Sequence, residues 1–304
     1  MIRATGRFGA LRLLPALLRG VWPQLALVLL LGAVSVRLGP GLSRRLTPDL
    51  VLPLLGIVTS VLVGFRASQA YGRWWEARTL WGRLRTVSRA WKAALLALSA
   101  GGRLTANAQR MLDRQVLLVW TVVAELRPQV PPPLASQRDA LVVLRERQGL
   151  QVGQTSQSLF EAQSLDVALC FEQGQLEPMA RVLLIELVRD GIAAVGGLER
   201  LRSQTCPPLL ELLVRAVVWL FAWLIFLRLE ADVQTPAEGN AVALVLMLGY
   251  VLAERFSAGL DRPLDDPLLG LPQHHFCATI SRDLLGAAHP LAQPPQAAGA
   301  TVWT

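Results

Sequence analysis

The side chains with the clearest capacity for metal chemistry lie in the stretch HHFC, which contains His274, His275 and Cys277. Imidazole and thiolate groups of this kind hold zinc in tetrahedral sites. Neighbouring side chains on a helix point about 100° apart, so these three would converge poorly on a single ion. We therefore expect them to be structural surface residues, and we expect neither a metal nor a cofactor.

The chain offers few residues for covalent or acid–base catalysis. It contains only three histidines and three cysteines, and no CxxC pair occurs. No Ser-His-Asp order, phosphate-binding loop or pair of catalytic carboxylates is present. We therefore do not expect an enzyme, and the widely spaced cysteines favour a reducing compartment over a disulfide framework.

A denser group of distinctive residues occurs in the stretch GFRASQAYGRWWEARTLWGRL, residues 64–84. Arginine and tryptophan both join an apolar body to a polar end, which suits the headgroup layer of a membrane. The uncharged run 50–65 leads directly into this stretch. We expect a helix that leaves the hydrocarbon here, with Glu76 pairing locally with Arg73 or Arg83. The residues that define the stretch are Arg73, Trp74, Trp75, Glu76, Arg78 and Trp81.

The composition favours a membrane protein. Hydrophobic residues make up 53% of the chain and charged residues only 17%. The formal net charge of +8 could indicate a nucleic-acid partner, but of the 30 basic residues only Lys92 is a lysine. The arginines flank apolar runs instead of filling one polar face. We therefore interpret them as topology signals and lipid contacts, and expect no nucleic acid.

Apolar runs occur in two close pairs along the chain. A membrane-spanning helix needs about 20 apolar residues, and buried core helices are the alternative for shorter runs. The first run ends in AVS, which resembles a signal-peptide cleavage site, but the basic segment before it is long and rich in leucine. We therefore favour retained membrane helices. Their expected positions are about 20–38, 50–70, 212–229 and 238–256.

The segments between and after these helices have helical periodicity and no strand signals. Helices are expected over 78–127, 136–150 and 175–203, with a polar loop at 151–160. Charge asymmetry places the arginine-rich segments, and with them both termini, on the cytoplasmic side. The chain is therefore expected to form a single domain, 1–304. It would have cytoplasmic helical regions at about 71–210 and 257–288, and a disordered Pro/Ala-rich tail at about 289–304.

Two ridges with four-residue spacing run along the second apolar helix. The small residues Gly56, Ser60 and Gly64 would let another helix approach closely. The larger Ile57, Val61 and Phe65 form the adjacent ridge. If identical helices packed in a ring through the small ridge, the large one would make an apolar constriction about 12 Å long. The alternative is that both ridges pack within one helix bundle.

Three stretches of the sequence together resemble the bestrophin family, specifically its bacterial members. The first is the apolar helix ending in GFR with the following AYGRWWEARTLWG, residues 70–82. The second is GGLERLRSQTCPPL, residues 196–209, and the third is GLDRPLDDPLLGLPQHHFCATISRDLL, residues 259–285. The resemblance covers nearly the whole chain and is weakest over 128–175.

This resemblance implies an all-α membrane protein with a defined architecture. Four transmembrane helices in two hairpins and a helical cytoplasmic region would assemble as a homopentamer around one axial pore, in a bacterial inner (plasma) membrane. By the same resemblance, the pore neck would consist of Ile57, Val61 and Phe65, with Val61 smaller than its counterpart in several relatives. A second narrowing at the cytoplasmic end would fall near Met179 or Ala180.

Animal bestrophins bind calcium through an acidic run after the last membrane helix. The matching region here has Asp261, Asp265 and Asp266, interrupted by Arg262, Pro263 and Leu264. A hard cation such as calcium takes about 6–8 oxygen ligands. We therefore expect helix caps and salt bridges at these aspartates instead of a calcium site.

The expected function is conduction of small monovalent ions, with membrane lipids as the other partners. The first hairpin loop carries Arg37, Arg44 and Arg45 against Asp49, which would concentrate anions such as chloride near the pore, while the second loop is acidic and offsets this field. Anions are therefore slightly favoured. A sodium-selective channel of the same architecture, and a non-conducting membrane scaffold or sensor, remain the alternatives.

Overall fold

The computed structural model describes residues 22–34, 37, 49–98, 104–150, 153–204, 207–232, 236–266 and 269–294. Within these ranges every regular element is a helix, as the periodicity predicts. The chain divides into two compact units. We call them the apolar unit (4–74 and 205–262) and the helical unit (1–3, 75–204 and 263–304). The 47-residue helix α2, Val51–Ala97, contributes residues to both.

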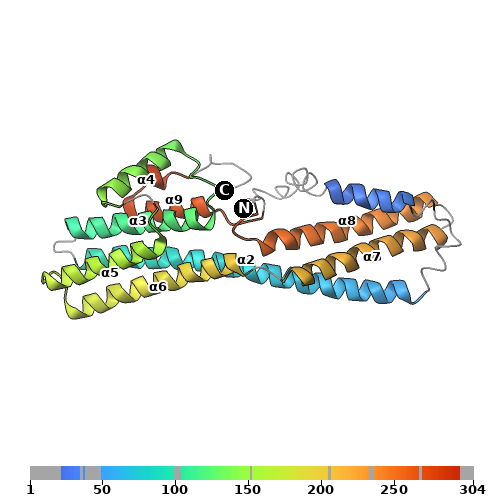
Figure 1. Ribbon diagram of the computed structural model, residues 1–304, viewed down its shortest axis with the longest axis horizontal. Helices are drawn as coiled ribbons and strands as arrows, with labels where there is room; N and C mark the ends of the chain where they lie inside the picture. The colour runs from blue at the N-terminus through green and yellow to red at the C-terminus, as the bar shows by residue number, and fades with distance from the viewer. Residues whose placement is uncertain are drawn as a thin grey trace. The chain divides into compact units, whose positions relative to one another are not determined.

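The apolar unit contains the membrane-type helices. Three helices are long and apolar enough to cross a bilayer: α2, Leu209–Arg228 within α7 (Pro208–Asp232), and Ala241–Asp261 within α8 (Pro236–Asp261). The apolar helix Trp22–Val34 is shorter over the described residues. Helices α7 and α8 run side by side in Figure 1. Three of the four expected spans are therefore present at full length in the described part of the chain.

The core of the apolar unit lies among these helices. It contains Val28, Phe221, Ala222, Ile225, Phe226, Ala243, Met247 and Val251. Many other large apolar side chains of this unit are exposed, among them Leu54, Leu213 and Val245. Exposure of such an apolar surface to water is unfavourable in free energy, so the surface is suited to contact with lipid or with other subunits.

The helical unit is built around α3, Ala106–Leu126. This helix packs against α5 (Ser156–Glu172) and α9 (Gln273–Leu285), and also against α4 (Ala135–Arg147) and α6 (Pro178–Ser203). The α3 residues from Val116 to Val123 are all buried. Because neighbours cover this half of α3 on several sides, the stretch VLLVWTVV is apolar on nearly every residue instead of on one stripe.

Two expected boundaries in the helical unit are wrong. The helix expected over 78–127 is divided into α2, which ends at Ala97, and α3, which begins at Ala106 behind its N-cap Thr105. The loop expected over 151–160 ends early, because Thr155 caps α5 and accepts a hydrogen bond from the backbone N–H of Ser158 at 3.2 Å. In both cases a threonine hydroxyl satisfies a free helix N–H and fixes the start of the helix.

The first residues of the expected disordered tail are ordered. Pro290–Ala292 forms the short helix η3, and the side chain of Leu291 is fully buried. The side-chain amide of Gln137 donates to the carbonyl of Gln293 at 3.0 Å. Composition alone suggests disorder here, but one buried leucine and hydrogen bonds from distant residues hold residues 289–294 in place.

The expectation that HHFC lies on the surface is also wrong for two of its residues. His274 and Cys277 are 1% and 0% exposed, because α9 lies against α3. The Cys277 thiol lies 3.5 Å from the carbonyl oxygen of Val119, and burial raises its pKa well above the usual value. Burial, assisted by the charge of Arg127, lowers the pKa of His274 to about 4. Within the described ranges, no three His, Cys, Asp or Glu side chains are grouped to hold a metal ion.

Candidate functional site

The larger ridge on α2 is exposed in the single chain. Ile57, Val61 and Phe65 have 63%, 50% and 65% of their surface accessible. They repeat every four residues on a continuous helix, so the three side chains lie along one side of it. Among the residues that the structure describes, none covers this apolar ridge, and it is available to lipid, to another subunit or to a pore.

The smaller ridge on α2 partly faces helices of the same chain. A Cβ atom on Gly56 would lie 3.2 Å from the Phe221 ring, so α7 approaches α2 closely there. The Ser60 hydroxyl lies 3.0 Å from the hydroxyl of Tyr250 on α8. A Cβ atom on Gly64 would meet nothing within 4 Å. The structure thus packs Gly56 and Ser60 within one bundle, while the chain leaves space beside Gly64.

The residues behind the two ridges fix the orientation of α2. The buried Thr59 hydroxyl donates to the carbonyl of Leu55 at 2.7 Å, so the polar group is satisfied inside its own helix. Phe221 and Tyr250 pack edge to face with ring centroids 5.5 Å apart. Because Phe221 also approaches Gly56 and Tyr250 contacts Ser60, this aromatic pair holds one face of α2 against α7 and α8.

A compact group of charges follows Phe65 immediately. The Arg66 guanidinium lies 3.3 Å from Glu211 of α7 and 3.8 Å from Glu254 of α8. Arg215 is 2.9 Å from each of the same two carboxylates. We call these four residues the charge cluster. Two positive and two negative groups balance one another, which makes burial of the Glu254 carboxylate tolerable.

The signature residues after Arg66 are distributed over several contacts. Arg73 forms a salt bridge of 3.0 Å with Asp261 at the end of α8, and the rings of Tyr71 and Trp74 stack. Glu76 pairs with Arg200 of α6 instead of with Arg73 or Arg83, and Arg83 pairs with Asp190 at 2.9 Å. The local pairing expected for Glu76 is therefore wrong, because packing places α6 beside α2 within reach of both residues.

The other candidate residues belong to elements other than the α2 ridge. Met179 and Ala180 are at the start of α6, with 78% and 7% of their surfaces exposed. Of the three aspartates at and after the end of α8, Asp261 pairs with Arg73. The carboxylate of Asp266 accepts a hydrogen bond from the N–H of Leu269 at 2.8 Å.

Sequence reasoning missed the charge cluster and Tyr250. A signal was available, because Glu254 directly follows the uncharged run 239–253 within the membrane-type span Ala241–Asp261. Ionisable residues in such helices are costly and need a partner, so their presence in a hydrophobic run indicates a buried ion pair. The sequence does not say which arginine provides it.

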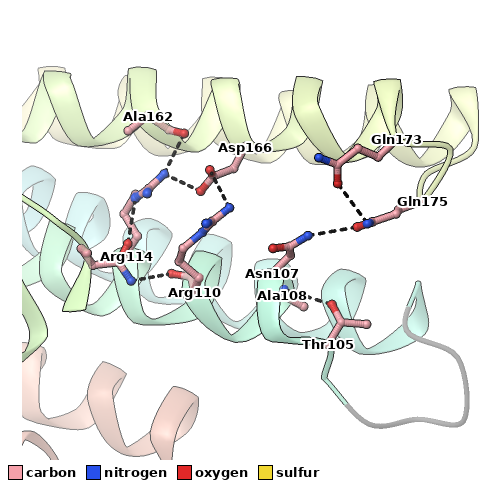
Figure 2. Close-up of polar contacts among 10 residues, drawn as sticks. Thr105, Asn107, Ala108, Arg110, Arg114, Ala162, Asp166, Gln173 and Gln175 are labelled. Atoms are coloured by element: carbon pink, nitrogen blue, oxygen red, sulfur yellow. Dashed lines mark hydrogen bonds and ion pairs between the residues drawn. The ribbon is translucent and has the colours of Figure 1, made fainter.

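The helical unit has its own buried polar layer between α3 and α5, shown in Figure 2. The Arg114 guanidinium donates to Asp166 and, at 2.8 Å, to the carbonyl of Ala162. Arg110 lies 3.4 Å from the same aspartate. Burial lowers the pKa of Arg114, and the charge of Asp166 opposes this effect. The layer fixes α5 against α3.

The chain matches known proteins over most of its length. The profile of the family described as Bacterial/Fungal Bestrophin protein matches residues 10–285. Among curated proteins, the chain is 24% identical over 238 residues to the "Voltage-dependent anion channel-forming protein YneE" of Escherichia coli K12, covering 76% of this chain and 74% of that protein. The protein of the same name in Salmonella typhi is 22% identical over the same length.

Solved structures share the fold. A crystal structure of a bacterial bestrophin homologue from Klebsiella pneumoniae carrying a point mutation has a TM-score of 0.74 and 23% identity. It is matched over 90% of this chain and 98% of that one. A second structure of that homologue, solved by zinc phasing, has a TM-score of 0.73 and 21% identity. With the family profile matching nearly the whole described sequence, the chain belongs to the family of bacterial and fungal bestrophins.

Proposed function

We propose that the protein is an ion channel of a bacterial inner membrane and that α2 lines its pore. The observation that carries this proposal is the exposed apolar ridge of Ile57, Val61 and Phe65. Apolar constrictions of this type gate ion flow by dewetting. The charge cluster directly after Phe65 supports the same arrangement, because it ties α2 to α7 and α8 next to the end of the ridge.

The proposed assembly is a homopentamer with four membrane helices per subunit and both termini in the cytoplasm. The open space at Gly64 and the exposed apolar residues of α2 support a close approach by another subunit. The exposed Met179 at the start of α6, with its neighbour Ala180, is proposed as the cytoplasmic narrowing. The mass of the purified protein by light scattering tests the stoichiometry independently of any current.

We propose a preference for anions such as chloride. The Escherichia coli relative carries "anion channel-forming" in its name. Asp49, the acidic residue of the first hairpin loop, lies 2.7 Å from Arg228, so its charge is offset within the chain. An excess of positive charge near a pore mouth raises the local concentration of anions.

Reconstitution into planar bilayers tests both conduction and selectivity. Under a sodium chloride gradient across the bilayer, the equilibrium potentials of chloride and of sodium have opposite signs. The sign of the measured reversal potential therefore separates an anion channel from a cation channel. Phe65→Ala and Ile57→Ala should increase conductance by widening the neck. Absence of current from protein shown to be pentameric would reject the channel and favour the scaffold alternative.

Cysteine accessibility separates a pore-facing ridge from a lipid-facing one. In a background without native cysteines, Val61→Cys should be modified by a charged thiol reagent with loss of current. Val245→Cys is the matched control, because Val245 is also apolar and exposed but lies on α8. Equal reaction at both positions would contradict the assignment of α2 as the pore helix.

A further inference from the structure

A pocket of about 210 Å³ lies in the helical unit, where the C-terminal end of α2 meets α3, α5 and α6. Its deep wall consists of buried side chains, each with less than a tenth of its surface exposed: Leu95, Ala108, Met111, Cys170 and Leu184. Apolar cavities of about 150 Å³ hold benzene in other proteins, so in proportion this pocket has room for about eight non-hydrogen atoms. The volume and the apolar wall are typical of a site for a small organic molecule.

The lining of this pocket is uncharged and lacks aromatic rings. Of the ten described residues that line it, none is Asp, Glu, Lys, Arg or His, and none is Phe, Tyr or Trp. Burial, and next the charge of Asp166, raises the pKa of the Cys170 thiol, so the thiol is neutral at neutral pH. An ion would lose its hydration here without gaining a counter-charge, and a flat ring would find no ring to pack on. The lining therefore favours an uncharged aliphatic ligand.

Hydrogen-bonding groups lie on the rim of the pocket. The Asn107 amide donates to the side-chain oxygen of Gln175 at 3.2 Å, and the Gln175 amide donates to that of Gln173 at 3.0 Å (Figure 2). An amide nitrogen carries two N–H groups, so Asn107 and Gln175 each keep one N–H that no described residue accepts. The side-chain oxygen of Asn107 likewise accepts from no described residue. Thr105, the other polar rim residue, is occupied as the N-cap of α3.

The arrangement of these groups sets the orientation of a ligand. The amides of Asn107 and Gln175 are at half-buried and exposed positions, whereas the deep wall of Met111, Cys170 and Leu184 is apolar and buried. An aliphatic chain would therefore point inward, with its polar head at the mouth. We propose that this pocket binds a small uncharged aliphatic molecule with one hydroxyl or amide head group. Asn107 both donates to and accepts from such a head, which suits a hydroxyl or an amide.

The Cys170 thiol reports occupancy of the pocket in the purified full-length protein. In Cys206→Ser the remaining thiols are Cys170, in the pocket wall, and Cys277, which is fully buried and does not line the pocket. Both are labelled with N-ethylmaleimide at mildly alkaline pH, and peptide mass spectrometry gives the two rates. Saturating 1-heptanol should slow the labelling of Cys170 by about tenfold or more and leave that of Cys277 unchanged. From 1-pentanol to 1-heptanol, affinity should rise about fourfold for each added CH₂.

Variants of the lining change the size and the polarity of the pocket separately. Ala108→Phe fills the pocket and should abolish protection by 1-heptanol, whereas Met111→Ala enlarges it and should extend protection to 1-nonanol. Asn107→Leu removes the hydrogen bonds of the rim and should weaken 1-heptanol binding by about three- to tenfold. Gln109→Leu is the matched control, because Gln109 lies on the same helix but does not line the pocket. It should bind like the wild-type protein.

Heptanoate tests the requirement for an uncharged ligand, and it should protect Cys170 at least about tenfold less well than 1-heptanol because the lining offers no counter-charge. Equal protection by heptanoate would reject the proposal. So would protection that Ala108→Phe and Asn107→Leu both leave unchanged. A Cys170 thiol that does not react at all would show that small molecules do not enter the pocket, which also rejects it. No readout here depends on current, so the result is separate from that of the channel proposal.

Discussion

The guanidinium of Arg66 lies 3.3 Å from the carboxylate of Glu211, one residue after the last member of the proposed neck. Arg66 is on α2 and Glu211 is on α7, and each side chain is also within reach of the other members of the charge cluster. The salt bridge therefore connects the end of the exposed ridge to the helices behind it. A disturbance of the cluster should be transmitted directly to the orientation of α2.

Removing the Glu254 charge should destabilise the apolar unit strongly. Its side chain is 8% exposed and faces both Arg66 and Arg215. Glu254→Gln would leave two arginines beside one carboxylate, a change that costs about 3–5 kcal/mol for a buried pair. Thermal unfolding of the protein in lipid nanodiscs measures the effect. Glu211→Gln, at a more exposed position, should cost less, and a reversed order would contradict the proposed burial of Glu254.

Replacing Lys92 should destabilise the C-terminal end of α9. The Lys92 ammonium donates to the carbonyls of Asp283 and Leu284 at 2.9 and 2.7 Å, so it caps the C-terminal end of that helix. Lys92→Met should lower the free energy of unfolding by about 1–3 kcal/mol. Arg89→Met is the control, because the Arg89 side chain is 60% exposed and a salt bridge from such a position is worth about 0–1 kcal/mol. Equal losses in a denaturant titration would argue against the capping role.

Two glycines on α6 should respond differently to alanine. A Cβ on Gly191 would lie 2.8 Å from the buried Phe160 ring, whereas Gly196 has open space. Gly191→Ala should therefore destabilise the helical unit by about 1–3 kcal/mol through overpacking. Gly196→Ala should be neutral or slightly stabilising, since alanine favours the helix. Parallel melting curves of the two variants provide the measurement, and a neutral Gly191→Ala would show that Phe160 can move away.

Acidification should destabilise the helical unit partly through His274. Its pKa is lowered from 6.5 to about 4 in the folded protein. The unfolded chain therefore binds the proton more readily, and stability present above pH 6.5 is lost as the pH falls towards 4. The loss amounts to about 3 kcal/mol when complete.

Stability measured between pH 7 and pH 4 in the wild type and in His274→Gln tests this dependence. The variant should lose less stability over this range, whereas the half-exposed neighbour His275→Gln should behave like the wild type. Identical pH profiles for wild type and His274→Gln would show that other groups account for the acid response.

Local features of the sequence predicted a large part of this architecture. Hydropathy is a property of neighbouring residues, so the apolar runs at 50–70, 212–229 and 238–256 anticipate α2, α7 and α8. The four-residue spacing of Ile57, Val61 and Phe65 is likewise fixed by one continuous helix, and the sequence alone places them on one side of it. The stretches 70–82, 196–209 and 259–285 together indicated the family that the profile match confirms.

Tertiary structure alone decided which residues meet across the chain. Glu76 pairs with Arg200 instead of a neighbour on α2, and Lys92 caps a helix end 191 positions away. Tyr250 reaches Ser60 only because α8 packs beside α2. Local periodicity determines which way a side chain leaves its own helix, whereas its partner depends on long-range packing that no short stretch of sequence encodes.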